Sequence, residues 1–189
     1  MTEPLLQTLF NDPGAAQLAG GIMMIMLFSA VGVAAAGAFA YVARRMFHGR
    51  YEQFFWSLLL IGIAAFYTGF AGWFQVETAA WRTELWAIAG FALLAILGLF
   101  SARMLACGYV AHGLWDIAHS LYGTSIHGLA ASDIPLGYGI FCLGFDIATA
   151  AYLLCWPKDW RQPGQFTPRF WRASMTTASA NVRRNQQEG

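Results

Sequence analysis

Apolar residues fall into five long runs along the chain, and polar or charged residues separate one run from the next. Each run approaches the roughly 20 residues that a helix needs to cross the hydrocarbon core of a bilayer. The pattern therefore predicts five transmembrane helices, over the ranges Ile22 to Val42, Phe54 to Phe74, Leu85 to Phe100, Met104 to Tyr122 and Leu136 to Trp156. The fold class that follows is an all-α, polytopic membrane helical bundle.

Helix-breaking and turn-forming residues mark where these helices begin and end. Pro135 precedes the fifth run and Pro157 ends it, because proline cannot continue a helix. Only Ser101 to Arg103 separate the third run from the fourth, so that turn must be tight. The chain thus divides into a transmembrane bundle at residues 1–157 and a juxtamembrane tail at 158–189. We expect this tail, which mixes aromatic residues with arginines, to lie along the cytoplasmic membrane surface.

Composition supports the membrane interpretation and excludes several other classes of protein. The chain of 189 residues is 58% hydrophobic and only 11% charged, against about 25% charged in an ordinary soluble domain. The net charge of +1 gives no sign of a nucleic-acid partner. Glu3 and Asp12 precede the first apolar run, whereas a secretory signal has a basic start, so we interpret this run as a retained span.

The distribution of basic residues predicts the orientation of the bundle. With five spans, one side of the membrane carries Arg44, Arg45, Arg50, Arg103, Lys158, Arg161, Arg169, Arg172, Arg183 and Arg184, and the other carries Arg82. Cytoplasmic loops hold the excess of Lys and Arg. The N-terminus is therefore predicted outside and the C-terminus in the cytoplasm, as for a multi-pass protein of a bacterial inner membrane. Glu77 and Glu84 are expected in an outer segment.

Four ionisable residues lie inside predicted spans, where charge is costly and usually functional. His112, Asp116 and His119 are spaced i, i+4 and i+7, so they share one face of the fourth helix. At 1.5 Å per residue, His112 lies about 15 Å below the outer end of that helix. Asp146 lies at the same depth in the fifth helix. Because short connections favour antiparallel neighbours, we expect Asp146 to face His112 and Asp116.

Histidine and carboxylate side chains that converge from facing helices suit zinc, iron or manganese. In this interpretation His112, His119 and Asp146 are the metal ligands. Asp116 is either a further ligand or the catalytic base that acts on a metal-bound water. The protein would then be a metal-dependent membrane protein that acts on a lipid-soluble substrate.

The same residues allow other interpretations. The aspartates could orient the histidines without a metal, which gives a proton relay or a polar ligand pocket. They could also form a structural hydrogen-bond network between helices. The protein would then be an accessory subunit of a larger membrane complex, or a small transporter. His127 and Asp133, in the loop before Pro135, are expected to be a solvated pair.

Small residues recur within the predicted spans and indicate close helix contacts. The glycines that we assign to this role are Gly20, Gly21, Gly108, Gly113, Gly137, Gly139 and Gly144. The three cysteines, Cys107, Cys142 and Cys155, lie in or beside apolar runs without a CxxC spacing, so they are expected to be packing residues.

Two resemblances rest on this part of the sequence. The stretch from Ala111 to Tyr122, with Cys142 to Asp146, resembles small uncharacterised bacterial multi-pass membrane proteins that carry an HxxxDxxH helix. That likeness implies no activity. The same residues are similar to membrane hydrolases of the alkaline ceramidase type, which hold zinc with histidines and an aspartate. This second resemblance implies a zinc-dependent hydrolase, although that family has seven spans against the five predicted here.

Overall fold

The computed structural model describes residues 13–122, 125–126, 129–132 and 134–155. Within these residues it contains five α-helices and one short antiparallel hairpin. In chain order the elements are α2 (Pro13–Met46), α3 (Arg50–Trp73), α4 (Thr78–Gly98), α5 (Ala102–Tyr122), β1 (Ser125–Ile126), β2 (Leu129–Ala130) and α6 (Leu136–Cys155). The all-α prediction is therefore confirmed, and each of the five predicted helices is present.

Four of the helices are long and apolar enough to cross a membrane: α2 over Gln17–Met46, and the whole of α3, α4 and α6. Helix α5 is not among the four. It has a comparable length of 21 residues, but it carries Arg103, His112, Asp116 and His119. The residues that give α5 its candidate chemistry also lower its hydropathy.

Helix α4 begins at Thr78, well before the predicted start at Leu85. Its first turns include Arg82 and Glu84, and the charges of these two residues were the reason for placing the start of the span after them. The structure places Glu84 inside α4, and not in the segment before the helix, and none of its surface is exposed. A charged residue can continue a buried helix where other polar groups pair with it. Glu84 has such partners in His119 and Ser132.

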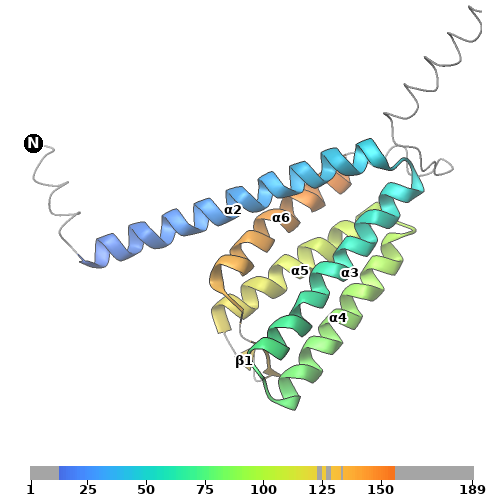
Figure 1. Cartoon of the computed structure of the whole chain (residues 1–189). Helices are drawn as coiled ribbons and strands as arrows, with labels where there is room; N and C mark the ends of the chain where they lie inside the picture. The colour runs from blue at the N-terminus through green and yellow to red at the C-terminus, as the bar shows by residue number, and fades with distance from the viewer. Residues whose placement is uncertain (1–12, 123–124, 127–128, 133, 156–189) are drawn as a thin grey trace, which may run out of the picture.

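Helix α5 lies at the centre of the arrangement that positions these residues. It packs against α6 on one side and α4 on the other, while α2 covers α6 and α3 packs on α4 (Figure 1). The N-terminal half of α2 extends past the other helices in the same view. The faces of α5 and α6 that meet carry His112, Asp116 and Asp146.

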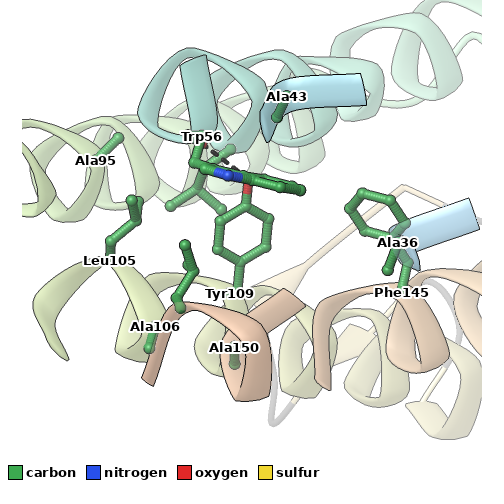
Figure 2. Packing of buried hydrophobic residues seen from close by; sticks show 11 residues of the cluster. Ala36, Ala43, Trp56, Ala95, Leu105, Ala106, Tyr109, Phe145 and Ala150 are labelled. Atoms are coloured by element: carbon green, nitrogen blue, oxygen red, sulfur yellow. Dashed lines mark hydrogen bonds between the residues drawn. The ribbon is translucent and has the colours of Figure 1, made fainter. Parts of the chain in front are cut away.

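A cluster of buried apolar residues holds α3 and α5 together next to this region. Trp56 and Tyr109 are completely buried, and their rings meet edge to face with centroids 6.2 Å apart. The Tyr109 hydroxyl also donates a hydrogen bond of 2.8 Å to the Trp56 carbonyl oxygen (Figure 2). Tyr109 precedes His112 by one helical turn, so this contact fixes the part of α5 on which the candidate site stands.

Five of the seven predicted close-approach glycines lie in tight helix contacts. A Cβ atom on Gly108 would lie 2.6 Å from the Leu60 side chain, and one on Gly137 would lie 2.9 Å from the Phe28 ring. The other three are Gly113, Gly139 and Gly144. A Cβ atom on Gly113 would lie 3.3 Å from Cβ of Asp146, and one on Gly139 would lie 2.5 Å from the Ser120 hydroxyl oxygen. A Cβ atom on Gly144 would overlap the backbone of α2 at Ser29. These three glycines therefore let α6 approach both α5 and α2.

The prediction was wrong for Gly20 and Gly21, where a Cβ atom would meet nothing within 4 Å. They lie in the N-terminal half of α2. The hairpin of β1 and β2 was not predicted either, because two-residue strands are too short to give a periodic pattern. His127, Asp133 and the predicted tail at 158–189 lie outside the described residues.

Candidate metal centre

His112, Asp116 and Asp146 form one buried group between α5 and α6. Each residue offers one ligand atom, and these atoms all lie within 4.8 Å of one another. The Nδ1 atom of His112 is 2.8 Å from Oδ2 of Asp146 and 3.2 Å from Oδ2 of Asp116. All three side chains are completely buried. The structure thus brings together the two aspartates and one of the two histidines that the sequence singled out.

Three polar atoms in this group lack a hydrogen-bond partner. Nε2 of His112, Oδ2 of Asp116 and Oδ1 of Asp146 are buried and accept or donate no hydrogen bond among the residues that the structure describes, although Asp116 Oδ2 lies 3.2 Å from His112 Nδ1. Leaving a buried polar atom unpaired costs about 1–3 kcal/mol. Such atoms are available to a bound ion, a water molecule or a ligand.

Helix α3 supplies a further contact to this group through Tyr67, a residue that the sequence did not indicate. The Tyr67 hydroxyl donates a hydrogen bond to Oδ1 of Asp116, so the other carboxylate oxygen faces His112. From α4, the Phe91 ring meets the His112 ring edge to face with centroids 5.1 Å apart. Hydrogen bonds and packing of this kind orient metal ligands in proteins.

His119 has a different environment from His112. Its Nδ1 atom is 3.0 Å from the carbonyl oxygen of Trp115, and its Nε2 atom is 3.0 Å from Oε1 of Glu84. Because a carbonyl oxygen can only accept, Nδ1 carries the hydrogen. Both ring nitrogens of His119 therefore have partners, and neither faces the group formed by His112, Asp116 and Asp146.

Glu84 joins His119 to the segment that follows β2. Its Oε1 atom accepts hydrogen bonds of 2.7 Å from both the backbone N–H and the hydroxyl of Ser132. Ser132 is completely buried as well. We refer to Glu84, His119 and Ser132 as the outer clamp, because they tie the loop before α6 to the helices. A carboxylate within the first turns of a long apolar helix was the signal that could have identified it.

Tyr67 connects the outer clamp to the buried group. Its ring stacks on the His119 ring, with centroids 4.9 Å apart and planes inclined by 30°, while its hydroxyl bonds Asp116. A continuous series of polar and aromatic contacts therefore runs from Ser132 to Asp146. Every residue in this series is buried.

The spacing of the ligand atoms fits a metal ion. Metal–ligand bonds of about 2.1 Å place neighbouring ligand atoms about 3.0–3.4 Å apart in tetrahedral or octahedral geometry. The two distances from His112 Nδ1, 2.8 and 3.2 Å, lie close to that range. One imidazole and two carboxylates suit zinc, iron or manganese. The group could therefore hold a metal ion.

The fold and this group together define a class: a helical protein with four candidate membrane spans and a buried His/Asp/Asp group. The chain belongs to a family of unknown function (DUF6010), whose model matches residues 18–158. This range contains all the residues of the buried group and of the outer clamp. No curated protein and no solved structure matches the chain. Membership agrees with the predicted resemblance to uncharacterised proteins, while the likeness to alkaline ceramidases remains a prediction.

Proposed function

We propose that this protein is a polytopic membrane protein that binds a divalent metal ion through His112, Asp116 and Asp146 and acts there on a lipid-soluble substrate. The observation that carries the proposal is the convergence of three buried ligand atoms, from two helices, within 4.8 Å of one another. Ligand sets of this kind, projected inward from facing helices, are how helical bundles build metal centres.

Charge balance supports the same conclusion. When both aspartates are ionised, the group carries two negative charges and one imidazole in a completely buried position. Isolated charge in a low-dielectric interior costs several kcal/mol per ion. A divalent cation would balance the two carboxylates, and the unpaired Oδ1 of Asp146 gives it a further donor atom.

Each residue of the site has a distinct proposed role. His112 of α5 and Asp146 of α6 would bind the metal ion from two helices that pack against each other. Asp116 binds through Oδ2, or accepts a proton from a water at the centre, while Tyr67 holds its other oxygen. When bound, the metal would supply Lewis acidity and activate water. His119, the other ligand predicted from the sequence, instead positions Tyr67 and Glu84 in this proposal.

We further propose that α5 also spans the membrane, which makes five spans in all, with the N-terminus outside and the C-terminus in the cytoplasm of a bacterial inner membrane. Helix α5 packs between α4 and α6, which are both candidate spans. His112, Asp116 and His119 are buried on its inner face, whereas Leu114 and Leu121 are 61% and 72% exposed on the opposite face. An apolar exterior around a polar interior is what a membrane-spanning helix with a buried site requires.

A proton relay is the second candidate function, favoured by one observation. Tyr67, Asp116, His112 and Asp146 form an unbroken series of hydrogen-bond and ion-pair contacts. Such a series can move protons without a metal. An accessory subunit of a larger membrane complex, in which the group is purely structural, is the third alternative.

Elemental analysis of the purified protein separates these functions. The wild type would be compared with His112→Ala and Asp146→Asn, and His48→Ala would serve as a control because His48 lies outside the group. We expect stoichiometric metal in the wild type and the control, and loss of the metal in both site variants. If the wild type remains free of metal after incubation with zinc, iron and manganese, the metal proposal is wrong and the metal-free functions take its place.

A further inference from the structure

A groove with a volume of about 820 Å³ runs along one face of α4. Arg82, Trp86, Gly90 and Leu94 of α4 line it, and Trp115 and Leu129 close it from α5 and β2. The α4 residues recur every four positions, so they form a single track along the helix. From Arg82 to Leu94 this track is about 18 Å long.

The wall of this groove is shared with the site described above. Phe91 lines the groove, and its ring meets the His112 ring with centroids 5.1 Å apart. Trp115 also lines the groove, and its ring meets that of His119 with centroids 5.0 Å apart. A molecule in the groove would therefore lie one side chain away from both the buried group and the outer clamp.

The groove is apolar except at one end. Arg82 is the charged residue in its lining, and it lies near the N-terminal end of α4. Its guanidinium group forms no ion pair with a carboxylate in the part of the chain that the structure describes. A long apolar track that ends at an unpaired cation is complementary to an amphiphile with an anionic head group.

We propose that this groove binds a single-chain amphiphile with a carboxylate head group, of the fatty-acid type. The head group pairs with Arg82, and the hydrocarbon chain lies along Trp86, Gly90 and Leu94. A single track on one helix accommodates one chain. We identify this amphiphile as the substrate class of the His112 centre, an assignment that rests on the proposed function.

The test measures binding of a dansyl-labelled fatty acid to the purified protein in detergent, by energy transfer from tryptophan. Gly90→Phe places a ring in the groove where a Cβ atom meets nothing within 4 Å, so the substitution fills the groove without a clash. Arg82→Gln removes the charge. The matched controls are Gly62→Phe, at an equally open site on α3, and Arg103→Gln, at an exposed arginine outside the groove.

We expect saturable binding to the wild type and to both controls. Gly90→Phe should weaken binding about tenfold or more, because the ring occupies the space of the hydrocarbon chain. Arg82→Gln should weaken binding by a similar factor, because a charge-assisted hydrogen bond to the head group is lost. Unlabelled palmitate should compete about tenfold better than hexadecanol, which has the same chain and no charge.

Equal binding to Gly90→Phe and the wild type would overturn the proposal, and so would equal competition by palmitate and hexadecanol. A dimeric wild type that becomes monomeric in Gly90→Phe would also overturn it, because a second copy would then occupy the groove. The His112→Ala variant separates this proposal from the metal centre. If His112→Ala loses the metal and still binds the fatty acid, the groove is supported independently of the metal centre. If the wild type binds metal but no fatty acid, the groove proposal is wrong and the metal centre stands alone.

Discussion

The Nδ1 atom of His112 lies 2.8 Å from Oδ2 of Asp146, although 34 positions separate the two residues in the sequence. The contact joins α5 to α6 at the place where Gly113 allows the closest approach of Asp146. It also makes each residue dependent on the other, because both side chains are completely buried.

Asp146→Asn keeps the shape of the side chain but removes its charge, so it should abolish the effect of metal on stability. A metal that binds only the folded protein stabilises it by about 2.7 kcal/mol at a concentration 100 times its dissociation constant. We expect added zinc or manganese to raise the Tm of the wild type in detergent and to leave that of Asp146→Asn unchanged. A chelator should reverse the increase. Equal shifts in both proteins would place the metal elsewhere.

Tyr67→Phe should weaken metal binding without changing the fold. The substitution removes the hydrogen bond to Asp116 and leaves the ring that stacks on His119. Loss of a group that orients a ligand typically costs 10–100-fold in metal affinity. Titration with zinc under competition from a chromophoric chelator measures the change. Tyr41→Phe, at a tyrosine that is 62% exposed, is the control and should bind zinc as the wild type does.

Glu84→Gln should destabilise the protein by about 1–3 kcal/mol, because it removes a buried carboxylate oxygen that bonds both His119 and Ser132. His119→Gln should have a similar effect, and the double variant should be less destabilised than the sum of the two, since the residues contact each other. Unfolding in detergent monitored by circular dichroism gives these values. Glu77→Gln, at an exposed glutamate next to the start of α4, should change little. Additive effects would mean that the outer clamp is not a coupled unit.

Gly144→Ala should destabilise the packing of α2 on α6 by about 1–3 kcal/mol, because its Cβ atom would overlap the backbone at Ser29. Gly37→Ala is the matched control on α2, where a Cβ atom meets nothing within 4 Å. That control should be neutral or slightly stabilising, since alanine favours a helix over glycine by about 1 kcal/mol. Thermal unfolding of the two variants side by side measures the difference. Similar Tm values for both would contradict the close approach.

The proposed topology predicts opposite locations for the two chain ends. A fluorescent protein fused to the C-terminus should fluoresce, because it folds in the cytoplasm, and alkaline phosphatase fused at the same place should be inactive. A cysteine introduced in the N-terminal segment should react with an impermeant reagent in intact cells. If α5 does not cross the membrane, four spans remain and both ends lie on the same side. Five spans would therefore be ruled out if both chain ends were found on the same side, for example a fluorescent C-terminal fusion together with an unreactive N-terminal cysteine.

The order of residues along the chain is enough to predict the five helices and the residues that share a face. Apolar runs of about 20 residues require helices, and the spacing of His112 and Asp116 puts both on one side of a helix whatever surrounds it. The level of Asp146 in the following helix also came from counting residues. These features depend on local geometry, which the order of residues fixes.

Which polar groups pair depends on how the helices pack in three dimensions. Glu84 and Ser132 meet because α4 continues past its charged residues and the hairpin folds back against it. Tyr67 reaches Asp116 because α3 packs beside α4 and α5. His119, on the same face of α5 as His112, pairs with Glu84 because it lies about two helical turns nearer the C-terminal end of α5, opposite a different helix. Pairings of this kind depend on distances between helices, and no periodicity within a single helix contains them.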